Sequence, residues 1–267
     1  MALSSLSVEA RGFDGVPYRV DVNGGGPNLT TSNQTPRQFL VIEGGEARDR
    51  GLNPIWPKRL RLFMLDVDVE PLFGQPERDV SVEVFDITGG TDTLAFRGFM
   101  LTDFFGDAPF APENIVELQA LDGLGSLGND PLTTIYSEGD TFATYTDAIT
   151  RILGTLYAMD VEFGVQWYPS EGSLTSSDNP LQSTGFDPNN YRDDRPEGGT
   201  WDNQLNVLKD LCKSQGLVVR QVRRAGGARW HVRQRDALNP DGTIKVWTYN
   251  NVGTLVSGPT TLDRSQT

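Results

Sequence analysis

The first hundred residues alternate apolar and polar side chains with a period of two, which is the pattern of a β-strand with one buried face. Residues 17–22 and 80–87 alternate in this way. Residues 93–101 return after the Gly-rich turn at 88–92 and predict the second arm of a hairpin. Further strands are predicted at residues 39–42, 59–65 and 115–120. Strands at this spacing, divided by turns, predict a barrel or a sandwich.

After residue 140 the apolar spacing becomes helical. Residues 144–147 offer an N-cap, and the apolar positions that follow recur at i, i+3, i+4 and i+7: Ile149, Ile152, Leu153 and Leu156. A strand is predicted next, at residues 161–167.

The same order of helix and strand recurs further along the chain. Thr200 is predicted to cap a helix with one apolar face, formed by Trp201, Leu205, Leu208 and Leu211. Gly216 supplies the stop, and residues 217–222 and 229–233 predict a hairpin.

These elements predict an α+β protein that is mainly β. Residues 1–130 form a β-rich barrel or sandwich domain, and residues 131–250 form an α+β domain with two helix–strand units. Within the second domain, residues 169–199 are rich in Ser, Asn, Asp, Gly and Pro and are predicted to be a long exposed loop. Residues 251–267 are predicted to be a flexible tail.

Composition restricts the partners. The net charge of −13 would repel nucleic acid from most of the surface, so we expect no sequence-specific nucleic-acid binding. No run of 18 apolar residues exists, so no membrane span is expected. The first residues lack the cationic and apolar regions of a secretory signal, and we expect assembly in the cytosol.

Positive charge is concentrated in one segment. Residues 209–235 hold eight Lys or Arg and one acidic residue, a net +7, so the remainder of the chain carries −20. Such polarity can dock one copy on another. An equally open reading is a solvated hairpin. The candidate assembly contacts are Arg223, Arg224, Arg229, Arg233 and Arg235 on the basic side, and Asp193 and Asp194 on the acidic side.

Few residues suit catalysis. His231 and Cys212 are the one histidine and the one cysteine, and both fall in predicted core elements, so we read them as structural. No motif for a phosphate loop or spaced calcium loop is present. We therefore expect no cofactor, no metal and no enzymatic activity, although a carboxylate pair of a glycan hydrolase stays an alternative.

Two stretches carry a resemblance to a known family. The strand Phe96-Arg97-Gly98-Phe99 is followed by residues 116–127, which end in Ala120-x-Asp122-Gly123-Leu124-x-x-Leu127. This pattern resembles bacteriophage and prophage tail-tip or baseplate-hub proteins, and the similarity covers residues 15–235. Many proteins with the pattern are longer than this chain.

The resemblance implies a structural component of the virion tail, assembled in the cytoplasm of a bacterial host. It implies a ring at the end of the tail tube, as a homo-oligomer (a trimer is favoured and a hexamer is possible). The tube, the spike or tip and the tape measure would be its partners. Asp122, Gly123, Leu124 and Leu127 would then support the fold. A second hypothesis is a carbohydrate- or receptor-binding module that uses exposed aromatic residues, namely Trp167, Tyr168 and Tyr191.

Overall fold

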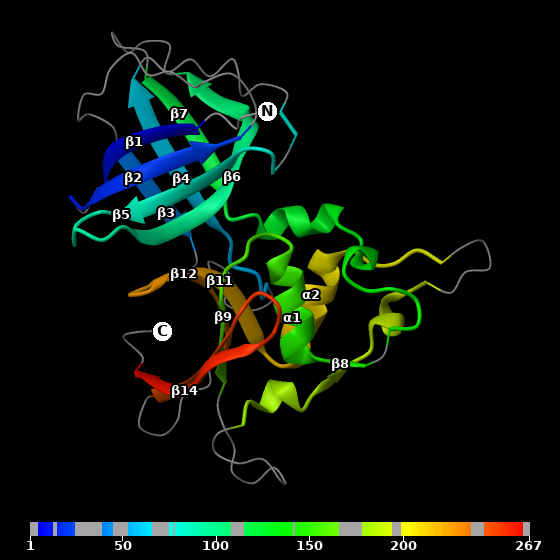
Figure 1. The fold of residues 1–267 in the computed structure, drawn as a ribbon. Helices are drawn as coiled ribbons and strands as arrows, with labels where there is room; N and C mark the ends of the chain where they lie inside the picture. Colours follow the sequence, from blue (N-terminus) through cyan, green and yellow to red (C-terminus); the bar gives the residue numbers. More distant parts are fainter. Residues whose placement is uncertain are drawn as a thin grey trace. The chain divides into compact units, whose positions relative to one another are not determined.

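The computed structural model describes most of the chain, in the following ranges: residues 5–12, 15–24, 39–44, 53–65, 75–76, 78–107, 115–140, 142–165, 178–193, 199–235 and 243–263. The chain forms two compact units (Figure 1). The barrel unit contains Met1–Glu46, Pro57–Gly123 and Gln221–Ala228. The sheet–helix unit contains Ala47–Trp56, Leu124–Arg220 and Arg229–Thr267. The units are thus interleaved along the sequence, where we predicted one boundary near residue 130.

The barrel unit is a closed barrel of seven strands. In barrel order the strands are β1 (Ser5–Gly12), β2 (Pro17–Asn23), β5 (Ser81–Asp86), β6 (Thr93–Asp107), β7 (Ile115–Leu121), β4 (Lys58–Leu65) and β3 (Phe39–Gly44). All neighbours are antiparallel except β1 and β3, which close the barrel in parallel through Arg11↔Phe39 and Gly12↔Leu40.

Alternation fills the inside of the barrel with apolar side chains. In β2 and β5 every second residue is buried, as the period of two predicts. All seven strands contribute to one core, in which Phe96, Leu60 and Leu118 are among the largest fully buried side chains. The predicted β-barrel half and the predicted hairpin of β5 and β6 are both confirmed.

The sheet–helix unit is built on strands of a five-stranded sheet. Its order is β11 (Leu217–Arg224), β12 (Gly227–Gln234), β9 (Val161–Val165), β13 (Thr243–Tyr249) and β14 (Leu255–Asp263). Two helices, α1 (Tyr145–Gly154) and α2 (Gln204–Ser214), pack on each other, and α1 packs on β9. The short elements are β8 (Ala143–Thr144), β10 (Gly185–Phe186) and the 3₁₀ turns η2 (Leu124–Asn129), η3 (Leu132–Thr134), η4 (Pro180–Gln182) and η5 (Pro188–Tyr191).

The N-cap residues of the two helices can be compared with those predicted from the sequence. Thr144 caps α1, accepting from the Asp147 N–H at 3.1 Å, while the Asp147 carboxylate accepts from the Thr144 N–H. The cap predicted for the second helix was wrong. Asn203, not Thr200, accepts from the Asn206 N–H at 2.9 Å, and the helix begins at Gln204. Asn is the stronger capping residue of the two.

Two segments predicted to lack structure hold elements in the described residues. In the predicted loop at 169–199, residues 178–193 form η4, β10 and η5, since Leu181 and Phe186 are buried and anchor them. Residues 166–177 and 194–198 lie outside the described residues. In the predicted tail, β14 pairs with β13. Leu255, Val256, Thr260 and Thr261 are residues that suit a strand, and the register is irregular where Gly258–Pro259 interrupts them.

Candidate functional site: the strand-exit motif and the arginine hairpin

Asp122 joins two barrel strands at the point where β7 ends. Its side chain is fully buried, and its Oδ2 accepts from the Lys58 backbone N–H at 2.7 Å. The Asp122 N–H donates in return to the Lys58 carbonyl oxygen at 3.1 Å. The Lys58 amide belongs to the first residue of β4, 64 positions away in the sequence. The carboxylate thus extends the β4–β7 ladder by one place.

The residues that follow Asp122 take the chain out of the barrel. Gly123 has φ +83°, a left-handed conformation that favours glycine. Leu124 and Leu127 come next in η2 and are both fully buried. These positions agree with the expectation that the motif supports the fold.

Gly98 lies in the other stretch that carries the resemblance. Close packing between strands explains why this position holds a glycine. A Cβ at this position would lie 2.4 Å from the Leu121 carbonyl oxygen and 2.7 Å from the Phe96 ring. Real Cβ atoms do not approach this closely, so β6 and β7 could not keep this separation with a larger residue. The aromatic–Arg–Gly pattern therefore describes close contact between strands.

Gln221 was not among the residues predicted to matter. Its side chain is fully buried, and its Nε2 donates to the Arg97 carbonyl oxygen at 2.9 Å. Its Oε1 accepts from the Arg97 N–H at 3.0 Å. The one available signal was a glutamine within the predicted strand at residues 217–222, next to Val222.

The candidate arginines have carboxylate partners within the same chain. Arg223 pairs with Asp86, and Arg229 pairs with the buried Glu162 at 3.1 Å. The Thr88 N–H, donating to Asp86 at 2.8 Å, lowers the pKa of that carboxyl, and Arg223 lowers it further. Arg223 and Arg224 end β11, and the turn of the hairpin is residues 225–226.

The structure describes all but one of the remaining charged candidates. Arg224, Arg233 and Arg235 are half-buried, as is Asp193. The Asp193 N–H donates to the Thr200 carbonyl oxygen at 3.0 Å, so this acidic residue belongs to a short antiparallel bridge. Asp194 lies outside the described residues. An intermolecular contact between these two groups stays a prediction.

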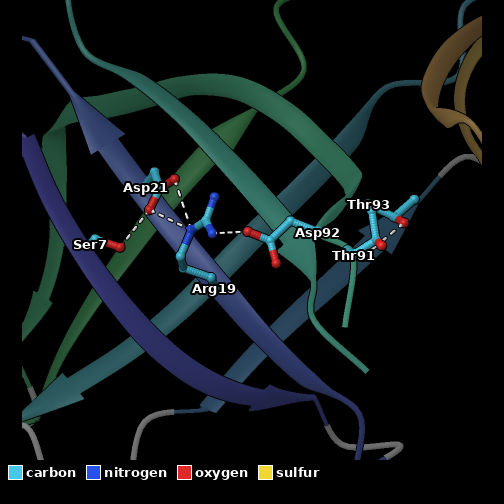
Figure 2. Close-up of polar contacts among 6 residues, drawn as sticks. All are labelled: Ser7, Arg19, Asp21, Thr91, Asp92 and Thr93. Carbon is cyan, nitrogen blue, oxygen red and sulfur yellow. Dashed lines mark hydrogen bonds and ion pairs between the residues drawn. The ribbon is translucent and has the colours of Figure 1, made fainter. Parts of the chain in front are cut away.

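A second charged network lies on the barrel wall, and it was also missed (Figure 2). Arg19 pairs with Asp21 at 3.1 Å and with Asp92, and the Ser7 hydroxyl donates to Asp21 at 2.6 Å. The Arg19 guanidinium also covers the Phe85 ring, 4.5 Å from its centroid. Arg19 and Asp21 lie two residues apart on one face of β2, a spacing visible in the sequence.

The two residues best suited to catalysis, the histidine and the cysteine, are buried. His231 and Cys212 are both fully buried, and burial raises the pKa of the Cys212 thiol. A high thiol pKa opposes thiolate chemistry. Across the described ranges, no three His, Cys, Asp or Glu side chains gather into a metal-binding group. Of the aromatic residues in the receptor-binding hypothesis, Trp167 and Tyr168 lie outside the described residues, and Tyr191 is half-buried against Phe186.

Comparison with known proteins adds no relative. No protein-family model matches the chain, and no curated protein sequence matches it. In the described part of the chain, no helix has the length and apolar character needed to cross a membrane.

Proposed function

We propose that the chain is a structural subunit of a bacteriophage-type tail tip or baseplate, which acts by shape and assembly. The observation that carries the proposal is the role of the pattern residues. Gly98, Asp122, Leu124 and Leu127 all lie in tight packing or backbone bonds. Gly98 and Asp122 hold the end of the barrel, whereas Leu124 and Leu127 are buried at the start of the sheet–helix unit. A pattern whose residues all support the fold suits a scaffold whose shape is its function.

The filled barrel also bears on how such a subunit would work. Its interior is occupied by apolar side chains from every strand. A tail tube needs a channel, and a barrel packed in this way offers none along its axis. In the proposed assembly the channel therefore lies between subunits of a ring, with three copies favoured and six possible.

The test is to locate the protein in tailed particles. Particles purified from the source culture are analysed by mass spectrometry and labelled with gold-conjugated antibody against the purified chain. We expect peptides of the chain in the particle and gold at the distal end of the tail. Gold on the capsid alone, or absence of the chain from intact particles, would refute the proposal.

Salt dependence tests the charge hypothesis within this proposal. If the basic hairpin contacts an acidic surface of a neighbour, rings seen by negative-stain microscopy should dissociate as the Debye length falls from about 10 Å at 0.1 M salt to about 3 Å at 1 M. The variant is Arg224→Glu, which leaves the ion pair of Arg223 with Asp86 in its own chain intact. Rings that persist in this variant at low salt would exclude the contact.

A further inference from the structure

An exposed aromatic side chain lies just before the first turn of α1. Phe142 is 76% exposed, the largest value among the large apolar side chains of the described residues. It precedes Thr144, the cap of α1, by two residues, and it leads into β8, where Ala143 pairs with Phe186 of β10. Complete burial of a phenylalanine contributes about 1.5–3 kcal/mol, which this position leaves unused within the chain. Phe142 is therefore available to anchor a partner.

A second exposed apolar side chain borders the same end of α1. Val252 is 68% exposed and lies in the turn between β13 and β14. A Cβ on Gly253 would lie 3.0 Å from the Asp147 carboxylate, so this turn rests on the first turn of α1. The Asp147 carboxylate also accepts from the Thr144 N–H, which ties the helix to the segment that carries Phe142.

Aromatic packing fixes the base beneath Phe142. The ring centroid of Phe186 lies 5.6 Å from that of Tyr136 and 5.6 Å from that of Tyr191. Phe186 and Tyr136 are each 3% exposed, so β10, the partner strand of β8, is held in a small core of its own. A surface on a fixed base loses little conformational entropy when a partner binds.

Acidic side chains surround the two exposed apolar ones. Asp140 is exposed and lies two residues before Phe142. The Asn189 Nδ2 joins Asp140 to Asp187, since it donates to the Asp140 carbonyl oxygen at 3.3 Å and to the Asp187 carboxylate at 3.0 Å. The register of β8 and β10, continued by one pair, places Asp187 opposite Phe142. Asp147, in the first turn of α1, is the third carboxylate of this group.

The wider surroundings are acidic as well. Five acidic residues and no lysine or arginine occur in three segments, residues 135–150, 178–191 and 246–262. The two arginines that directly follow the first two segments are engaged, because Arg192 pairs with Glu138 and Arg151 lies 5.5 Å from the Tyr136 ring centroid. Even when both are counted, acids outnumber bases by five to two. A positively charged partner is therefore favoured here, and an acidic one is repelled.

We propose that the Phe142 surface, formed by Phe142, Val252, Asp140, Asp147 and Asp187, binds a basic amphipathic segment of another protein. Apolar side chains of the segment would cover Phe142 and Val252, and its Lys or Arg side chains would meet the carboxylates around them. An apolar centre with a charged rim is the usual arrangement of a protein interface. The inference goes beyond the proposed function and does not depend on it.

The test measures the binding of three synthetic peptides of equal length to the full chain by isothermal titration calorimetry. One alternates Leu and Lys, one alternates Ser and Lys, and one alternates Leu and Glu. We expect the Leu–Lys peptide to bind, the Ser–Lys peptide to bind at least about tenfold more weakly because it lacks apolar side chains, and the Leu–Glu peptide not to bind. Equal binding of the two lysine peptides would indicate general charge attraction and overturn the inference, as would no binding of the Leu–Lys peptide.

Substitutions locate the contact on the chain. Phe142→Ser should weaken binding of the Leu–Lys peptide at least about tenfold, as expected for an aromatic anchor. Asp140→Asn should weaken it roughly two- to fivefold, the size typical of an exposed ion pair, and should reduce its dependence on salt. Asp79→Asn removes an exposed charge from the barrel unit and should leave binding unchanged. Unchanged melting temperatures would show that the variants fold. An unaltered affinity in Phe142→Ser overturns the inference.

Hydrogen exchange distinguishes the possible occupants of the surface. Amides of residues 142–147 and 250–254 should exchange more slowly when the Leu–Lys peptide is added. Protection confined to other segments overturns the inference. Protection of the same residues that grows with protein concentration, without peptide, would identify a second copy as the occupant and also overturn it. None of these results touches the composition of tail particles, which tests the proposed function separately.

Discussion

The side-chain amide of Gln221 stands in for a strand beside Arg97. Pairing of β6 with β7 begins at Phe99↔Leu121, so β7 has already ended where Arg97 would need its partner. The amide both donates to and accepts from the Arg97 backbone, at 2.9 and 3.0 Å. A buried side chain thereby bonds to two main-chain groups that would otherwise lack a hydrogen-bond partner on a neighbouring strand.

Replacing Gln221 should therefore cost more than the loss of an ordinary polar side chain. Gln221→Ala leaves the Arg97 N–H and carbonyl without these bonds, and we expect a loss of roughly 2–4 kcal/mol in the free energy of unfolding. Urea denaturation measures it. Gln182→Ala removes an exposed glutamine and should change stability by less than about 0.5 kcal/mol. Equal effects of the two substitutions would contradict the role of Gln221.

Gly98 should not tolerate a methyl group. In Gly98→Ala the new Cβ would overlap the Leu121 carbonyl and the Phe96 ring, and we expect a loss of about 1–3 kcal/mol. Gly125→Ala is the matched control, since a Cβ there meets no atom within 4 Å. Thermal melting of both variants compares them directly. A neutral Gly98→Ala would show that β6 and β7 can separate without cost.

Acid should destabilise the protein through two paired carboxyls. Arg61, bonding Glu117 at 2.6 Å, lowers the pKa of Glu117, as the Thr88 amide lowers that of Asp86. A carboxyl with a lowered folded pKa stabilises fully above its unfolded pKa, about 4, and loses this contribution as pH falls. Asp86→Asn with Glu117→Gln should reduce the decline in stability between about pH 5 and pH 2.

Urea midpoints measured across that range test the acid prediction. Asp79→Asn, which removes an exposed charge, controls for the change in net charge. A double variant whose stability declines as steeply as that of the unsubstituted chain would show that other carboxyls dominate.

The pair of Arg229 and Glu162 should show strong coupling. Glu162 is 4% exposed, so Arg229→Met would leave its carboxylate buried without the guanidinium, at a cost of about 3–5 kcal/mol. Adding Glu162→Gln should restore part of that loss. A double-mutant cycle by urea denaturation gives the coupling, expected at about 1–3 kcal/mol. Additive effects would mean that the pair contributes nothing specific.

Local signals in the sequence predicted the elements that depend on neighbouring residues. The hairpin of β5 and β6 follows from alternation around a Gly-rich turn, and α1 follows from its cap at Thr144 and its apolar spacing. The strand-exit motif could be located for the same reason, since Asp122-Gly123 marks a turn and Leu124 and Leu127 mark a core.

The rest depends on contacts between distant parts of the chain. Alternation gives no register for the parallel closure of β1 and β3, and β14 becomes a strand because β13 offers an edge. The Arg97 site was missed because its second half lies 124 residues away. The cap at Asn203 was missed because Thr200 is also a capping residue type, and the apolar spacing did not fix the first turn of the helix.

The interleaving of the barrel unit has a consequence for biosynthesis. Its strands are complete at Leu121, yet Gln221–Ala228 also belong to it. A nascent chain must wait until these residues leave the ribosome before the Arg97 position is satisfied. Truncation before Gln221 would yield every barrel strand and still an unfinished barrel. Premature termination of translation would therefore leave a product with an unfinished barrel, which cellular proteases would degrade.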